Sequence, residues 1–148
     1  MKLSTKARYG ARAALDLALN YGPSPVPLRD IAERQEISER YLENIMSALV
    51  SAGLVGSTRG KNGGFMLSKP PRDIRLGDVV QVVEGSLAPV PCVDDPGQCG
   101  RSSLCVTKEI WKRLKDAIHG VLGSITLLDM VEMHRQKSSN QSGPMFYI

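Results

Sequence analysis

The residues whose side chains are best suited to chemistry are Cys92, Cys99 and Cys105, the only three cysteines of the chain. Six residues separate the first two cysteines, and five separate the second and third. The residues between them are rich in Pro, Gly, Asp and Ser, which favour turns over helices and strands. A looping backbone can bring the three sulfur atoms together, and thiolates are soft ligands that select iron–sulfur clusters, zinc or cuprous copper. We therefore interpret this loop as a metal or cluster site.

Two other interpretations of the cysteines stay open, namely a redox thiol pair with one spare cysteine and cysteines that only fill space. Structural cysteines usually lie in apolar segments, whereas these three lie in a polar loop, which favours the metal site. Zinc is less favoured than a cluster because the spacing lacks the CxxC pairs typical of structural zinc.

Composition narrows the class of protein. A chain of 148 residues, of which 42% are hydrophobic, is expected to form one compact domain or a small domain with an appended arm. The net charge of +4 is consistent with a polyanionic partner. The sequence contains no secretory signal and no apolar run long enough to span a membrane. An odd number of cysteines argues against a disulfide framework, so we expect a cytoplasmic protein without a membrane partner.

The first third of the chain predicts a helix-turn-helix. Apolar residues recur at helical spacing over 5–20, 28–35 and 39–52, and a tight turn joins the second and third segments. Ser38 is a good N-cap for the third helix, and Gly53 follows its end. The polar face of this helix is suited to base edges and phosphates in a major groove, although an ordinary solvated face is the alternative. Its residues are Ser38, Glu39, Arg40, Tyr41, Asn44 and Ser47.

A β-hairpin is predicted directly after this helix, with strands at 54–58 and 64–68. Its tip contains Arg59, Gly60 and Lys61, followed by Asn62 and Gly63. The glycines permit the positive φ angles of a tight turn, and the two cations stand beside them. Arg59 could enter a narrow minor groove, where the negative potential is enhanced. A hairpin after a recognition helix is the wing of a winged-helix domain. The predicted fold is therefore mainly α with a small β-hairpin wing: a winged helix-turn-helix DNA-binding domain at 1–70.

The rest of the chain is expected to connect and dimerise. A short helix at 76–84 and the cysteine loop make up 71–105, and a long helix runs from after Cys105 to about Gly120. Ser124 can cap a last helix to about His134, so that 106–135 hold the dimerisation helices and 136–148 form a disordered tail. The long helix carries an apolar stripe that needs a partner surface. A second subunit is favoured over the chain's own first helix, because helix-turn-helix proteins commonly dimerise to read palindromic sites. The stripe consists of Ile110, Trp111, Leu114, Ala117, Ile118, Val121 and Leu122.

Several stretches together resemble the IscR-type family of bacterial winged-helix regulators, which includes nitric-oxide and cysteine-metabolism sensors. They are residues 1–10, 26–32, 37–43, 53–55 and 59–65, together with the three cysteines. The likeness is strongest to the family's regulators of iron–sulfur cluster assembly. It implies that Cys92, Cys99 and Cys105 ligate a [2Fe–2S] cluster, which is favoured over [4Fe–4S]. It also implies that Tyr41, Glu43 and Asn44 lie on the recognition helix and Arg59 in the wing.

The chain departs from the family pattern at one ligand. The family carries a histidine three residues after the last cysteine, where this chain has Lys108, and a protonated ammonium has no lone pair to donate. The fourth cluster ligand is therefore unknown, and the carboxylates of Asp94, Asp95 and Glu109 are candidates.

The sequence as a whole predicts a homodimeric, cluster-sensing regulator that binds a palindromic duplex. The predicted DNA-binding residues are Ser38, Arg40, Tyr41, Glu43, Asn44, Arg59, Gly60 and Lys61. A metal-free thiol or cysteine-metabolism regulator is the alternative, followed by a protein-interaction scaffold that binds no DNA. An enzyme is not expected, because His119 and His134 lack a nucleophile or carboxylate constellation.

Overall fold

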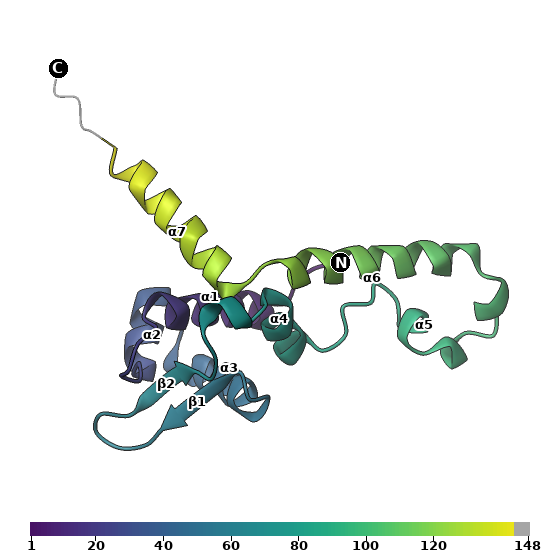
Figure 1. Ribbon diagram of the computed structural model, residues 1–148. Coiled ribbons are helices and arrows are strands. Elements are labelled where there is room, and N and C mark those ends of the chain that lie inside the picture. Colours follow the sequence, from purple (N-terminus) through teal and green to yellow (C-terminus); the bar gives the residue numbers. More distant parts are fainter. Residues whose placement is uncertain (144–148) are drawn as a thin grey trace.

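A computed structural model describes residues 1–143, which form a helical body, a hairpin and an arm (Figure 1). The arm consists of the cysteine loop and the long helix after it, residues 91–124. The body and hairpin comprise α1 (Thr5–Leu19), α2 (Leu28–Gln35), α3 (Glu39–Ser51), β1 (Val55–Thr58), β2 (Gly64–Leu67), the 3₁₀ turn η1 (Pro71–Asp73) and α4 (Leu76–Glu84). The cysteine loop and the C-terminal part comprise α5 (Pro91–Asp94), η2 (Pro96–Gln98), η3 (Ser102–Leu104), α6 (Val106–Ser124) and α7 (Leu127–Gln141). Within this described part, no helix has the length and apolarity needed to cross a membrane.

The helix-turn-helix forms where the capping residues predict it. The Ser38 hydroxyl accepts a hydrogen bond from the backbone N–H of Tyr41 at 3.2 Å, which satisfies a donor that the first turn of α3 cannot pair. Glu36 ends α2 in the left-handed conformation, with φ of 55°. This reversal leaves room for only a short turn before α3. The predicted pair of helices is confirmed.

One apolar core joins the helix-turn-helix to α1, α4 and α7. The core face of α3 is fully buried and consists of Leu42, Ile45, Met46 and Leu49. Val79, Val80 and Val83 of α4 and Leu127 and Val131 of α7 join the same core. Gly10 allows α1 to lie close to α4, because a Cβ there would stand 3.2 Å from a methyl of Val83. The helix predicted at 76–84 is therefore an integral part of the helical body.

The hairpin is antiparallel and is fixed to the body at its base. Val55 pairs with Leu67 and Thr58 with Gly64. Val26 adds a bridge to Phe65 through two backbone hydrogen bonds of 2.8 Å. A Cβ at Gly64 would lie 2.3 Å from the Val26 carbonyl oxygen, so only glycine permits this approach. The predicted wing is confirmed, and the segment before α2 holds it in place.

The C-terminal helices differ from the prediction in two respects. Thr126, and not Ser124, caps α7: it accepts from the Asp129 N–H at 3.0 Å, while the Asp129 carboxylate accepts from the Thr126 N–H at 2.9 Å. The helix does not end near His134 but continues to Gln141, so 136–141 are helical and not disordered. Once this capping box has nucleated the helix, each further residue adds a backbone hydrogen bond, which extends α7 even through Ser138, Ser139 and Asn140. Residues 144–148 of the expected tail lie outside the described residues.

Candidate nucleic-acid interface and cysteine loop

The outer face of α3 presents the predicted DNA-binding residues as one surface. The side chains of Ser38, Arg40, Tyr41, Glu43 and Asn44 are all exposed, whereas the opposite face of the helix is buried. Burying one face against the core orients the other outward, as a helix entering a major groove requires. The structure brings these residues together, and their contact with bases stays a prediction.

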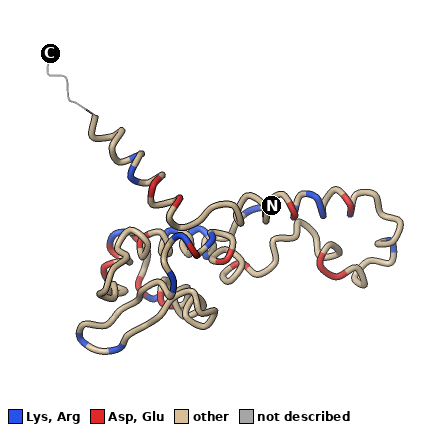
Figure 2. The backbone as a smooth tube through the Cα atoms, viewed as in Figure 1, with Lys and Arg blue, Asp and Glu red and all other residues tan. Residues whose placement is uncertain are grey.

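The hairpin tip places two cations at the end of a narrow loop. Arg59, Gly60 and Lys61 are exposed, and Gly60 has φ of 106°, which favours glycine. A Cβ at Gly63 would lie 2.1 Å from the Thr58 carbonyl oxygen, so the loop closes this tightly only with glycine. Figure 2 shows basic positions at the far end of this loop. The tip is therefore slim and positive, as a phosphate or minor-groove contact requires.

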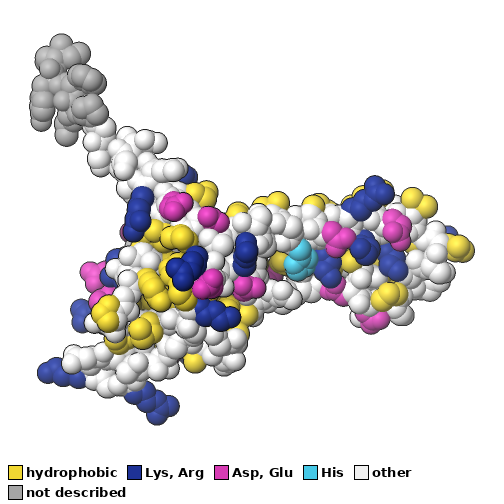
Figure 3. All heavy atoms as spheres, in the orientation of Figure 1, with side chains coloured by type: hydrophobic (Ala, Val, Ile, Leu, Met, Phe, Trp, Pro, Cys, Tyr) yellow, Lys and Arg dark blue, Asp and Glu magenta, His cyan; other side chains and the backbone are white. Residues whose placement is uncertain are grey.

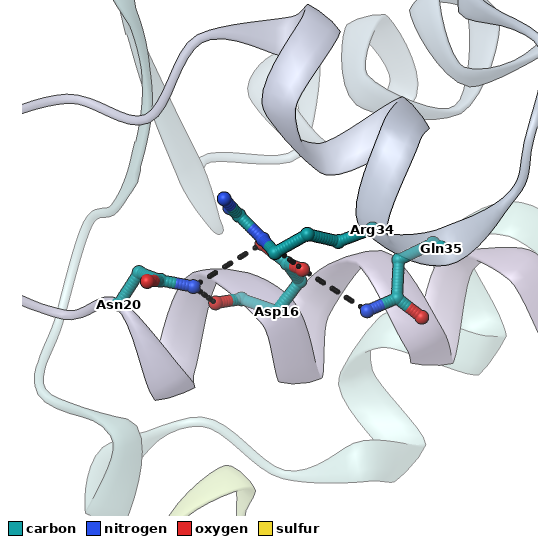
Figure 4. A network of polar contacts seen from close by, with 4 residues as sticks. All are labelled: Asp16, Asn20, Arg34 and Gln35. Carbon is teal, nitrogen blue, oxygen red and sulfur yellow. Dashed lines mark hydrogen bonds and ion pairs between the residues drawn. The ribbon is translucent and has the colours of Figure 1, made fainter.

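A buried carboxylate that the sequence analysis did not single out joins α1 to α2. Asp16 is 1% exposed and accepts hydrogen bonds from Arg34 Nε at 3.0 Å, Arg34 Nη2 at 2.7 Å and Gln35 Nε2 at 3.0 Å (Figure 4). Asn20 reaches both the backbone oxygen and the carboxylate of Asp16. The hydrogen bond to Asp16 raises the pKa of Arg34. An acidic residue among Ala13, Ala14 and Leu17 on the apolar face of α1 is the signal that points to it.

The cysteine loop does not assemble the expected site. Cys92 lies in α5, Cys99 follows η2, and Cys105 is the N-cap residue of α6. All three are free thiols; Cys99 is exposed and the other two are half-buried. Among residues 1–143, no group of three His, Cys, Asp or Glu side chains is arranged to hold a metal ion. Turn-forming residues thus produce short helical turns that carry the thiols on separate elements, and the expected convergence is absent here.

Polar contacts tie two points of this loop to α6. Lys115 of α6 donates to the Asp94 carboxylate at 2.6 Å, and Ser86 also donates to Asp94. These hydrogen bonds, that of Lys115 foremost, lower the pKa of Asp94. Lys108 donates to the Ser102 hydroxyl at 2.6 Å. Lys108, which stands where the resemblance places a histidine, therefore connects the loop to α6. The position of the loop is therefore linked to α6.

The Cys105 thiol differs from the other two in its surroundings. It lies 3.2 Å from the Thr107 hydroxyl. This hydrogen bond, followed by one from the Lys108 backbone, lowers the pKa of Cys105 below that of an ordinary thiol. The thiolate is the form that ligates metals and attacks disulfides. The surroundings of Cys105 therefore favour the form that either role requires.

An iron–sulfur cluster matches this donor set in chemistry. Three thiolates supply three of the four protein ligands that a cluster usually takes. Bringing them to one cluster requires the loop to rearrange, and α5, η2 and η3 contain no buried residue to resist it. Asp94 and Asp95 already accept hydrogen bonds, Asp94 from Lys115 and Asp95 from the Gly97 N–H at 3.1 Å. Cys92, Cys99 and Cys105 would hold the group.

No other element within residues 1–143 fully covers the apolar stripe of α6. Not one residue of this 19-residue helix is buried, and Ile110 and Val121 are 52% and 60% exposed. Apolar side chains are visible along the arm in Figure 3. Near the body, Ala117, Ile118 and Leu122 line a groove of about 520 Å³ with Leu3 and Leu87. This chain alone therefore leaves the stripe half-buried to exposed.

Comparison with known proteins identifies the family. Residues 3–133 match the Rrf2 family, described as iron-dependent transcriptional regulators. The chain belongs to the Rrf2 family. The HTH-type transcriptional regulator CymR of Bacillus subtilis strain 168 is 40% identical over 148 residues, 100% of both chains. IscR of Escherichia coli K12 is 43% identical over 131 residues, 88% of this chain and 80% of that one.

Solved structures of Rrf2 relatives share the fold. The structure of T. potens IscR has a TM-score of 0.73 at 42% identity, over 99% of this chain and 97% of that one. The structure of B. subtilis CymR, described as its global cysteine regulator, has a TM-score of 0.74 at 39% identity, over 90% and 98%. This Rrf2 protein is thus a winged-helix transcriptional regulator that binds DNA, and it is not an enzyme. The predicted family, fold class and absence of catalysis are confirmed.

Proposed function

We propose that this Rrf2 protein is a cytoplasmic homodimer that binds a palindromic operator and senses iron–sulfur cluster status through Cys92, Cys99 and Cys105. A [2Fe–2S] cluster is favoured over [4Fe–4S]. The observation that carries the proposal is the presence of three free thiols in one loop that α6 holds by ion pair and hydrogen bond. The description of the family as iron-dependent regulators supports it. A bound cluster supplies a group that responds to iron supply and oxidation.

The loop is placed to influence dimerisation and hence DNA binding. A rearrangement that gathers the thiols would move the loop segments of Asp94 and Ser102, which accept hydrogen bonds from Lys115 and Lys108 of α6. We assign the stripe of α6 to a second subunit, so the loop bears on the spacing of two winged-helix bodies. Two bodies at fixed spacing read two half-sites. The base-reading surface is Ser38, Arg40, Tyr41, Glu43 and Asn44, and the wing contact is Arg59, Gly60 and Lys61.

Cluster binding is tested by anaerobic reconstitution of the full chain. Cys92→Ala, Cys99→Ala and Cys105→Ala are each expected to lose visible absorbance and bound iron, because each removes one of three ligands. Ser103→Ala, an exposed residue of the same loop, is the matched control and should load like wild type. A cysteine variant that retains full iron content and colour would show that the three-thiolate site is wrong.

The fourth ligand is tested in the same assay with Asp94→Asn, Asp95→Asn and Glu109→Gln. One of these variants is expected to shift the absorbance spectrum or accelerate cluster loss. If all three match wild type, the ligand is a solvent molecule, another side chain or a group of the second subunit.

A metal-free thiol regulator is the second candidate function. It is favoured by the separation of the thiols, by the lowered pKa of Cys105 and by similarity to CymR. Protein that stays colourless after reconstitution, and that loses operator affinity reversibly on treatment with a mild oxidant, would establish it. Cys105→Ser should then abolish the oxidant response while leaving the affinity of the reduced protein unchanged.

A further inference from the structure

We propose that Tyr9 and Arg12 of α1 are positioning residues that orient Tyr41 of α3 for its contact with operator DNA. The inference rests on the proposed assignment of Tyr41 to the interface. It adds two residues outside the helix-turn-helix and wing that determine how well that interface binds.

Tyr9 restricts the side chain of Tyr41 by direct ring contact. The two ring centroids are 5.7 Å apart and the ring planes meet at 87°, the edge-to-face geometry that aromatic pairs prefer. Tyr9 packs against the core, while Tyr41 is 37% exposed. The Ser38 cap fixes the backbone of Tyr41 but not its side chain. An exposed tyrosine loses rotamer freedom on binding DNA, and a ring already held in place loses less.

Arg12 also contacts the Tyr9 ring. Its guanidinium carbon lies 5.4 Å from the centroid of the Tyr9 ring, within cation–π range. Arg12 Nε donates to Gln35 Oε1 at 3.3 Å, and Arg12 Nη2 donates to the Gln35 carbonyl oxygen. Gln35 is the last residue of α2, where the exposed carbonyls favour a cation. The guanidinium is therefore bound by protein on two sides.

The contacts form a continuous connection from the core to the interface. Gln35 donates to the buried Asp16 carboxylate at 3.0 Å, and that carboxylate is fixed by Arg34 (Figure 4). From Gln35 the contacts pass through Arg12 and Tyr9 to Tyr41. Because α1 also packs on α4 and α7, the orientation of Tyr41 depends on the helix at the centre of the body.

The test measures operator affinity and its salt dependence for the full chain. The probe is a fluorescent duplex enriched from a random-sequence library by wild-type protein, with a scrambled duplex for non-specific binding. Tyr9→Leu and Arg12→Met are each expected to weaken operator binding about two- to tenfold, the range of one aromatic or cation–π contact. Tyr9→Phe keeps the ring and should bind like wild type. Non-specific affinity should not change in any of them.

Salt dependence separates positioning from direct phosphate contact. A residue that neutralises a phosphate lowers the slope of log affinity against log salt by about one when it is removed. Arg12→Met should leave that slope unchanged. Arg8→Met is the matched control: it removes the same charge from α1, but within residues 1–143 the Arg8 side chain bonds only to Thr5 of its own helix turn. A loss in Arg12→Met accompanied by a lowered slope, or equal losses in both variants, would overturn the positioning role.

A double-mutant cycle distinguishes failure of this inference from failure of the proposed interface. Tyr9→Leu and Tyr41→Leu should be less than additive, because each removes the same pair. If Tyr41→Leu binds like wild type, the interface assignment fails and the positioning role with it. If Tyr41→Leu weakens binding while Tyr9→Leu and Arg12→Met do not, the interface stands and positioning is refuted. Should Tyr9→Leu unfold, the exposed Arg12→Met decides alone.

Discussion

The body and the arm of this Rrf2 protein differ in how far they bury their apolar side chains. In the body, the core residues of α1, α3, α4 and α7 cover one another almost completely. In the arm, α6 also carries an apolar stripe, yet none of its residues is buried. Burial of apolar surface is the main favourable term in folding, so the body contains its own stabilisation, whereas the arm does not.

This contrast suggests a division of labour. A body that folds by itself can keep the α3 face and the hairpin tip in fixed relation. If the partner of the arm is another copy, as proposed above, the spacing of two bodies depends on assembly. The cysteine loop is attached to α6 and not to the core, through Lys115 and Lys108. We infer that a signal received at the loop acts on assembly and leaves the DNA-reading surface itself intact.

The largest expected effect comes from placing a charge in the α6 stripe. Ile118→Asp should convert the protein to monomer and abolish specific operator binding, because an unpaired carboxylate in an apolar seam is costly to desolvate. Sedimentation measures the assembly, and circular dichroism checks that the body is folded. A folded variant that stays dimeric would mean that the stripe is covered in another way. His134→Asp on the exposed outer part of α7 is the control and should remain dimeric.

A pair of isoleucines tests the contrast within one chain. Ile45 of α3 is 0% exposed and Ile110 of α6 is 52% exposed. In the monomeric Ile118→Asp background, Ile45→Ala should lower the free energy of unfolding by about 2–5 kcal/mol, as core truncations do. Ile110→Ala should change it by less than about 0.5 kcal/mol, because little surface is lost. Urea unfolding of both variants measures the difference, and equal losses would refute the division between body and arm.

The body was also the part that the sequence predicted best. Its helices and hairpin follow from local signals, such as the Ser38 cap and the tip glycines, that agree with apolar periodicity. The start of α7 was misplaced because Ser124 was preferred to Thr126, whose capping box with Asp129 is the stronger signal. Its end was missed because the Ser, Asn and Gln residues from Gln136 onward were interpreted as a disordered tail. The Arg12–Gln35 contact was not predictable, since it joins residues 23 positions apart across two packed helices.

The cysteine loop shows a different limit of sequence reasoning. The types and spacing of Cys92, Cys99 and Cys105 identify a donor set, but turn residues do not specify which turns form. Short helical segments at Pro91 and Pro96 hold the thiols on separate elements. The donor set could therefore be proposed from the sequence here, whereas the turns that carry the thiols could not be predicted.

Mutations in the hairpin tip are expected to have an intermediate effect on operator affinity. Arg59→Ala should weaken operator binding by about 1–3 kcal/mol if the side chain makes a specific groove contact. Lys61→Ala, two residues along the same tip, should weaken specific and scrambled duplexes alike and lower the salt slope by about one. Fluorescence anisotropy over a salt series measures both. Full affinity in Arg59→Ala, or binding that does not depend on salt, would exclude the wing from the interface.

The smallest expected effect concerns the link between the loop and α6. Lys115→Gln should speed amide hydrogen exchange over 91–95 at neutral pH and leave exchange in the α3 core unchanged, since the ion pair with Asp94 touches the loop alone. Lys112→Gln is the matched control, because Lys112 pairs with Asp116 inside α6 at 2.9 Å. Its loop should exchange like wild type, whereas equal acceleration in both variants would exclude a specific link.

Acid should reproduce the Lys115→Gln behaviour in the wild type. The hydrogen bonds from Lys115 and Ser86 lower the pKa of Asp94 in the folded chain. The stabilisation of the loop is therefore fully present above the ordinary aspartate value of about 3.9 and is lost as the pH falls through the lower folded value. Wild-type loop protection should fall toward that of Lys115→Gln only in this acidic range, and the variant itself should show little change there. If wild-type protection is already lost between pH 7 and pH 5, a group other than Asp94 holds the loop.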